Sequence, residues 1–403
     1  MKVHSPEAVG MSAERLARIP AVMQQFVKDN QLPGILTLVQ RKGKVVHYGQ
    51  YGLVDIEAGR PIQEDALFRI YSMTKPIVSV ALMTLYEEGR FSLTDPVSKF
   101  IPAFAKTKVY AGAAPLGLTL VDQNPAMTLH HLLTHTSGLS YGWFFDSPVE
   151  ELYRALVPNL YQRDQSLEEV VNRLAELPLL FQPGTQWRYS FATDVLGYAI
   201  QVIADMPLAD FLQERIFKPL GMTDTAFVVP PEKRDRLAQI YKSEKLYGPV
   251  ALQPDEVGLL RDVTVPTQCP SGGGGLISTL GDYFAFCHCL INRGRYAGGR
   301  LLGPRTVEWM TADHIPAHLK PLKMGAEHLD FGFGLGFKVA TSLGEARSLT
   351  SVGAYGWGGA AKTDFWIDPA EEMIGLMMTQ YMPIEPYPVQ ERFKNLAYQA
   401  IAD

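Results

Sequence analysis

The heptapeptide Ile-Tyr-Ser-Met-Thr-Lys-Pro, residues 70–76, opens a long apolar run in which Ser72 and Lys75 stand three positions apart. From Ser72 to Glu88 the apolar residues recur at helical spacing, so the run predicts a helix with one apolar face. Side chains three positions apart lie on the same side of a helix. The sequence therefore predicts that the Ser72 hydroxyl and the Lys75 amine meet at the start of this helix.

This pair has two interpretations. Unpaired N–H groups point outward at a helix start, and Pro76 in the first turn costs no internal hydrogen bond, which suits a nucleophile at Ser72. A lysine is a base only as the neutral amine, so Lys75 would need desolvation or a neighbouring positive charge. The alternative is an N-capping serine followed by a solvated lysine. The two residues alone do not decide between these interpretations.

Strand patterns lie toward both ends of the chain. Residues 35–40 and 45–52 are two β-rich runs, and Gly43 between them can take the positive φ that a hairpin turn needs. Three further β-rich runs follow late in the chain: FGFGLGFKV (331–339), TDFWIDP (363–369) and MIGLMMTQ (373–380). We expect one sheet that is assembled from both ends of the chain.

Helical patterns surround and separate these strands, at residues 11–28, around 283–291 and at 389–401. The predicted fold class is α/β of the α+β type, with a mainly antiparallel sheet flanked by helices. We expect a discontinuous α/β domain of residues 1–75 and 270–403. Residues 76–269 are expected to form a mostly helical domain with long loops, and the active site is expected at the interface.

The composition excludes several classes of protein. The net charge of −5 in 403 residues comes from interspersed acids and bases, unlike the basic surface of a nucleic-acid-binding protein. The N-terminus lacks the apolar core of a signal peptide, and no stretch approaches the roughly 18 apolar residues of a membrane span. The three cysteines, Cys269, Cys287 and Cys289, fit a reducing compartment. We expect a cytoplasmic protein with no nucleic-acid or membrane partner, and the oligomeric state stays open.

The pentapeptide GLSYG, residues 138–142, matches the nucleophile elbow of another class of hydrolase. That motif requires a buried strand before its serine, whereas MTLHHLLTHTS, residues 127–137, has helical spacing. Gly138 is better explained as the end of a helix, so Ser140 is not the predicted nucleophile.

No metal or cofactor is predicted. His131 and His135 stand at the spacing of a zinc helix, but Leu132 occupies the place of the required glutamate. The residues of Cys287-His288-Cys289 point in different directions on a helix and chelate one ion poorly. The run Gly272–Gly275 lacks the ending of a phosphate loop, so it is either a bend or a backbone that passes close to a ligand.

Six segments between residues 68 and 369, taken in order, resemble the superfamily of serine β-lactamases and penicillin-binding proteins. Within it they are most similar to the family VIII carboxylesterases, which resemble class C β-lactamases. The segments are FRIYSMTKPIVSVALMTLYEEGRFSLTDPVSKFIP, LHHLLTHTSGL, FQPGTQWRYSFATDVLGYAI, PLGMTDT, SGGGGLISTLGDY and YGWGGAAKTDFWIDP. The resemblance implies a β-lactamase-like fold.

The resemblance also assigns roles by position. Ser72 would be the acyl-accepting nucleophile, Lys75 its partner, and Tyr189 in WRYSF the second base or proton shuttle. This agrees with the chemistry, because a phenolate and an amine together can pass the serine proton to the leaving alcohol. The oxyanion would be held by the N–H groups of Ser72 and Ala360. The substrate-binding residues expected from the resemblance are Tyr141, Phe191, Trp357, Gly358 and Gly359.

Two departures from the β-lactamase pattern favour an ester as substrate. Phe191 replaces the asparagine of the tyrosine motif, and Trp357-Gly358-Gly359 replaces the Lys-Thr-Gly triad. An amide and a cation that could grip a β-lactam are thus replaced by apolar groups. The nearby Lys362-Thr363-Asp364 lies five residues late, an odd shift that turns a strand's side chains to the opposite face.

We therefore expect a serine carboxylesterase for esters of small to medium acyl groups. The alternatives are a β-lactamase or D,D-peptidase on the same fold, and an acyltransferase. A ligand sensor without catalysis is disfavoured because Ser72, Lys75 and Tyr189 are all present.

Overall fold

The computed structural model describes the whole chain except residues 116, 161–164, 243–252, 255–261 and 383–386. Its main feature is one eight-stranded sheet in which every neighbouring pair is antiparallel. In sheet order the strands are β14 (Gly332–Phe333), β15 (Lys338–Val339), β16 (Tyr355–Gly358), β17 (Asp364–Asp368), β18 (Met373–Met378), β1 (Gly34–Arg41), β2 (Lys44–Asp55) and β3 (Arg60–Pro61).

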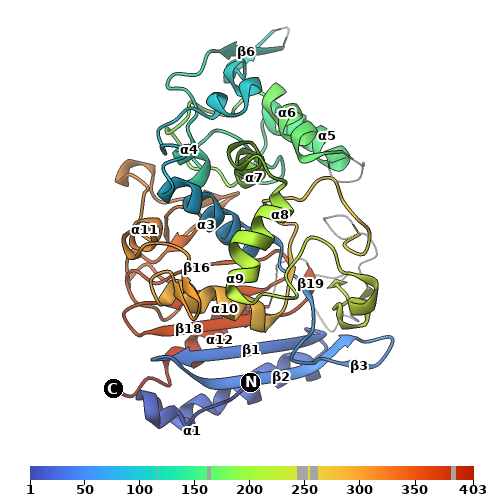
Figure 1. Cartoon of the computed structure of the whole chain (residues 1–403), viewed down its shortest axis with the longest axis vertical. Coiled ribbons are helices and arrows are strands. Elements are labelled where there is room, and N and C mark those ends of the chain that lie inside the picture. The colour runs from blue at the N-terminus through green and yellow to red at the C-terminus, as the bar shows by residue number, and fades with distance from the viewer. Residues whose placement is uncertain (116, 161–164, 243–252, 255–261, 383–386) are drawn as a thin grey trace.

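The centre of this sheet joins the two ends of the chain. Strand β1 pairs with β2 on one side and with β18 on the other, and Figure 1 shows the blue and red strands side by side. The predicted hairpin of β1 and β2 is confirmed, with Gly43 at φ 75° in its turn. The predicted fold class is confirmed as well.

Side chains alternate across the sheet and pack on helices at both faces. Phe365 of β17 contacts Tyr283 of α10 (Leu280–Ile291), with ring centroids 5.0 Å apart. Its neighbour Trp366 packs on the opposite face against Phe393 of α12 (Val389–Tyr398), at 5.3 Å. The two cores therefore lie on opposite sides of β17.

Three expected elements differ in detail. The helix expected over residues 11–28 is divided into α1 (Ala13–Leu16) and α2 (Arg18–Lys28). The run at 331–339 forms the two short strands β14 and β15, because Gly336 takes φ 92° between them. The helix after residue 72 is α3 (Thr74–Glu87), and a 3₁₀ turn, Tyr71–Met73, precedes it.

The middle of the chain contributes six of the twelve α-helices in the described residues, and Figure 1 shows most of them above strands β1, β2 and β18. They are α4 (Leu129–Leu133), α5 (Pro148–Leu160), α6 (Leu167–Glu176), α7 (Ala192–Ala204), α8 (Leu208–Leu212) and α9 (Lys218–Leu220), with a π-helical turn at Gln213–Phe217. An antiparallel hairpin of β5 (Val109–Ala114) and β6 (Gly117–Val121) also occurs here, and the sequence patterns did not predict it. The assignment of residues 76–269 to a separate helical domain stays a prediction.

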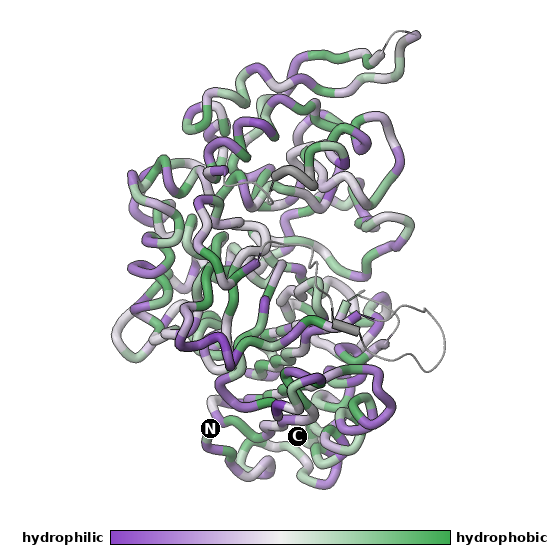
Figure 2. The backbone as a smooth tube through the Cα atoms, turned by 90° about the vertical axis from the view of Figure 1, so that its right-hand side faces the viewer, coloured by the Kyte–Doolittle hydropathy of each residue, from purple (hydrophilic) through white to green (hydrophobic). Residues whose placement is uncertain are grey.

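Shorter elements complete the described part of the chain. They are β4 (Phe68–Arg69), β7 (Tyr241–Lys242), β8 (Gln253–Pro254), β9 (Ile277–Ser278), β10 (Arg295–Tyr296), β11 (Gly299–Arg300), α11 (Pro304–Met310), β12 (Lys323–Met324), β13 (Glu327–His328) and β19 (Tyr381–Met382). Figure 2 shows both chain ends at the same end of the molecule, and Figure 1 shows that strands β1 and β2 lie at this end.

No single helix among the described residues is both long enough and apolar enough to cross a membrane. The segments Ala192–Ala204 and Leu208–Leu220 reach that length and hydropathy only as a pair, across a bend of 84°.

Candidate active site

Ser72 and Lys75 meet at the start of α3, as their spacing predicts. Ser72 lies in the 3₁₀ turn before the helix, and Lys75 lies in its first turn. The Lys75 Nζ donates to Ser72 Oγ at 3.2 Å and to the Gly273 carbonyl oxygen at 2.5 Å. Lys75 is only 2% exposed, which rules out the solvated lysine of the alternative interpretation.

Tyr189 lies beside this pair. The Lys75 Nζ stands 4.6 Å from the centre of the Tyr189 ring and 5.4 Å from that of Tyr141. The Trp357 Nε1 donates to the Tyr189 hydroxyl oxygen at 3.2 Å, so β16 contacts the same group. Distant parts of the sequence thus bring a hydroxyl, an amine and a phenol together, and the amine packs against two aromatic faces.

The run Gly272–Gly275 forms the turn that receives Lys75. The Gly273 amide donates to Asp194 Oδ1 at 3.1 Å, while its carbonyl accepts from Lys75. A β-carbon on Gly272 would lie 2.5 Å from the Thr193 carbonyl oxygen, so glycine lets the turn approach α7 closely. The backbone of this turn therefore passes close to helix α7. Asp194 was not singled out from the sequence, because no local pattern marks a contact between such distant segments.

The predicted oxyanion donors lie where β16 ends against the turn that carries Ser72. A β-carbon on Gly359 would lie 2.5 Å from the Ile70 carbonyl oxygen, so these two backbones are in contact. The Gly359 amide donates to the Thr363 carbonyl oxygen at 2.8 Å. The amides of Ser72 and Ala360 donate to no described residue, which leaves both N–H groups available.

Aromatic rings form one wall of this site. Tyr141 contacts Phe191 with ring centroids 4.4 Å apart and stacks on Trp143 at 5.0 Å. Phe144 lies 6.0 Å from Tyr189 by the same measure. Of the predicted substrate-binding residues, Tyr141 and Trp357 thus contact Tyr189, and Phe191 packs on Tyr141. We call residues 141–145 the aromatic loop.

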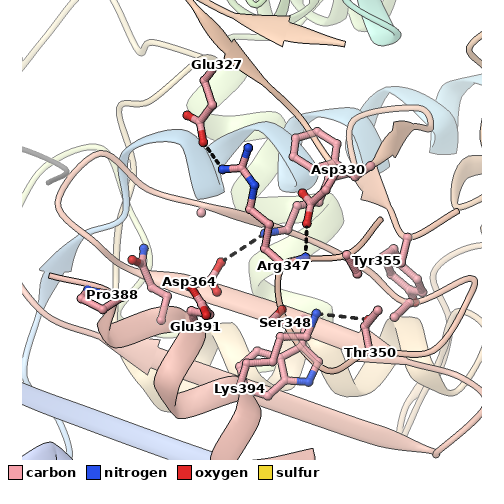
Figure 3. Close-up of a pocket in the computed structure, with 18 of the residues that line it drawn as sticks. Glu327, Asp330, Arg347, Ser348, Thr350, Tyr355, Asp364, Pro388, Glu391 and Lys394 are labelled. Atoms are coloured by element: carbon pink, nitrogen blue, oxygen red, sulfur yellow. Dashed lines mark hydrogen bonds and ion pairs between the residues drawn. The ribbon is translucent and has the colours of Figure 1, made fainter. Parts of the chain in front are cut away.

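Gly358 lines a different cavity, on the α12 side of the sheet. This cavity of about 660 Å³ is lined by charged side chains, among them Arg347, Asp364 and Lys394, as Figure 3 shows. Burial and the charge of Lys338 lower the pKa of Lys394 to about 8. None of Ser72, Lys75 and Tyr189 is among the residues that line it.

Lys362 does not take the place of the β-lactamase triad lysine. Its Nζ donates to the Tyr387 carbonyl oxygen at 3.1 Å, and its backbone has φ 64°. The neighbouring Thr363 Oγ1 instead contacts the Ile70 carbonyl oxygen, at 3.5 Å. This placement agrees with the expectation that a shift of five residues turns the Lys362 side chain to the opposite face of the strand.

The histidines have structural contacts. His131 Nδ1 accepts from the Thr128 amide in a capping box, and His135 lies beyond the end of α4 at φ 56°. Burial, followed by the charge of Lys75, lowers the pKa of His135 well below its usual value, so its ring is neutral beside Tyr189. No metal-binding cluster occurs among the residues that the structure describes.

Comparison with known proteins places this chain in a family. The sequence model of the family described as Beta-lactamase matches residues 19–399. The chain belongs to the beta-lactamase family. Esterase EstB of Burkholderia gladioli is 32% identical over 397 residues, which cover 93% of each chain.

Solved structures agree with this assignment to the beta-lactamase family. EstCE1, a hydrolase with promiscuous acyltransferase activity, has a TM-score of 0.81 at 25% identity and covers 96% of this chain and 99% of its own. Simvastatin synthase (LovD) from Aspergillus terreus has a TM-score of 0.80 at 26% identity, with 96% and 98% covered. The protein is therefore a serine hydrolase, and the resemblance drawn from the sequence is confirmed.

Proposed function

We propose that the protein is a carboxylesterase that hydrolyses neutral esters of small to medium acyl groups through an acyl-enzyme on Ser72. The observation that carries this proposal is the buried Lys75 amine, 3.2 Å from Ser72 Oγ and packed on the Tyr189 ring. A buried base beside a hydroxyl at a helix start is the arrangement that activates a serine.

The reaction has two steps. Ser72 Oγ attacks the ester carbonyl carbon, and its proton passes through Lys75 and Tyr189 to the oxygen of the leaving alcohol. Water then attacks the acyl-enzyme carbonyl, gives one proton back to Ser72 and releases the carboxylic acid. The Ser72 and Ala360 amides would hold the negative oxygen in both steps, because neither N–H is engaged elsewhere among the described residues.

The surroundings of Ser72 favour an ester over a β-lactam. Phe191 is fully buried against Tyr141, and Trp357 donates to the Tyr189 hydroxyl oxygen, so neither position places an amide or a cation beside Ser72. Lys362 is held at the Tyr387 carbonyl oxygen. The likeness to Esterase EstB also supports this substrate class.

The test of this substrate class compares a nitrophenyl butyrate with a chromogenic cephalosporin under the same conditions. We expect a larger kcat/KM for the butyrate, because the aromatic rings of Tyr141, Phe144 and Trp357 lie against Tyr189. Faster hydrolysis of the cephalosporin would instead show that β-lactams are the preferred substrates.

Acyl transfer is a second candidate function, favoured by the similarity to EstCE1 and LovD. An acyl-enzyme on Ser72 can pass its acyl group to an alcohol in place of water. Adding a primary alcohol to the butyrate assay distinguishes the two, since a transferase forms a new ester and a strict hydrolase forms only butyrate.

Replacing Tyr189 with phenylalanine tests the proton shuttle. Tyr189→Phe keeps the ring on which Lys75 packs and removes only the hydroxyl, so we expect kcat to fall about 10²-fold. Tyr355→Phe, on the same strand as Trp357, is the matched control and should keep kcat. A kcat in Tyr189→Phe equal to that of the control would remove Tyr189 from the proton path.

A further inference from the structure

The GLSYG motif, which the proposed mechanism does not use, is held by a buried carboxylate. Ser140 Oγ donates to Glu150 Oε2 at 2.6 Å and accepts from the Gly142 amide at 3.3 Å. Ser140 and Glu150 are both completely buried. Glu150 lies in the first turn of α5, where the helix start favours a negative charge. Ser140 is therefore a structural hydroxyl at the start of the aromatic loop.

Arg188 contacts the other end of the same loop. Its Nη1 lies 3.7 Å from Glu150 Oε1, and its guanidinium carbon lies 3.4 Å from the centre of the Phe145 ring. Arg188 directly precedes Tyr189 in the chain. The pair of Glu150 and Arg188 thus connects both ends of the aromatic loop to the segment that carries Tyr189.

The charges of this pair are shielded from water. The Arg188 side chain is 11% exposed and that of Glu150 is 0% exposed. Removing one partner of such a pair leaves an uncompensated buried charge, so the surrounding structure must move. The part that would move is the aromatic loop, whose Tyr141 and Phe144 face Tyr189.

We propose that Glu150 and Arg188 are a positioning pair that fixes the aromatic loop beside the bound acyl group, and thereby sets how well an aromatic acyl group such as benzoyl is accepted relative to acetyl. This inference rests on the proposed esterase function. An acetyl group is too small to contact much of the aromatic loop, whereas a benzoyl group must pack on rings such as Tyr141 and Phe144. The pair therefore acts on the choice of substrate rather than on the chemical step.

The test compares nitrophenyl benzoate with nitrophenyl acetate in Glu150→Gln, which keeps the acceptor for Ser140 and removes the charge that faces Arg188. We expect the benzoate-to-acetate ratio of kcat/KM to fall about tenfold through a higher KM for benzoate, with kcat for acetate nearly unchanged. Asp282→Asn is the matched control. Asp282 lies in the first turn of α10 and accepts from Thr225 Oγ1 at 2.9 Å, away from the aromatic loop. Its ratio should equal that of the unaltered protein.

Ser140→Ala is a second test variant if Glu150→Gln fails to fold. Its benzoate-to-acetate ratio of kcat/KM should also fall, by about threefold. An unchanged ratio in a folded variant would overturn the proposal. So would an equal loss with both esters, because that result indicates general damage to the site. If the unaltered protein hydrolyses neither ester, the esterase function itself is wrong.

Discussion

Replacing Ser72 with alanine is expected to lower kcat/KM for a nitrophenyl butyrate by about 10⁴-fold or more, because the acyl-enzyme can no longer form. Residual turnover would come from the remaining oxyanion donors and substrate binding alone. The substitution removes one hydroxyl that is partly exposed at the helix start, so the fold should persist. Steady-state kinetics and a thermal melt of the same sample check both statements.

The control for this variant is Ser79→Ala, in the helix that follows Ser72. Ser79 is 1% exposed and lies seven residues after Ser72, within α3, where its hydroxyl takes no part in the proposed reaction. We expect activity close to that of the unaltered protein. Butyrate hydrolysis in Ser72→Ala at the level of the Ser79→Ala variant would show that another residue is the nucleophile.

Replacing Lys75 with methionine is expected to lower kcat by about 10³-fold, because a positioned general base contributes a factor of this order. Methionine keeps an unbranched apolar chain of similar length, so packing against Tyr141 and Tyr189 is largely preserved. The lost contacts are the hydrogen bonds to Ser72 Oγ and the Gly273 carbonyl oxygen. Single-turnover kinetics should show that acylation is the slowed step.

Lys362→Met is the matched control for Lys75, since both lysines are 2% exposed and both donate to a backbone carbonyl oxygen. Only Lys75 also contacts Ser72. We expect Lys362→Met to retain kcat even if it lowers the melting temperature. Equal losses of kcat in the two variants would contradict the role of Lys75 as base, because replacing any buried lysine would then have the same effect.

Local patterns predicted the parts of the fold that depend on neighbours in sequence. The contact of Ser72 with Lys75 follows from helical spacing, and the hairpin of β1 and β2 follows from Gly43 between two β-rich runs. The run at 331–339 was predicted as a strand, but its division into two short strands was missed because that division depends on Gly336 taking a positive φ, which composition alone does not reveal.

Contacts between distant segments could not be derived from local patterns. The Gly273 carbonyl that accepts from Lys75 lies 198 positions away in the chain. Tyr189 was placed by family resemblance, since its sequence neighbours alone favour a core aromatic packed beside Trp187. Glu150 is only ten positions from Ser140, but no spacing rule pairs two side chains across an irregular loop.

The central claim is an acyl-enzyme on Ser72, and trapping that adduct tests it most directly. The protein is mixed with a nitrophenyl butyrate, quenched in acid during turnover and digested with trypsin for mass spectrometry. We expect one butyryl group on the peptide of residues 70–90, which contains Ser72, and none in Ser72→Ala. A butyryl group on the peptide of residues 109–154, which contains Ser140, or turnover by protein that never carries an adduct, would contradict the account.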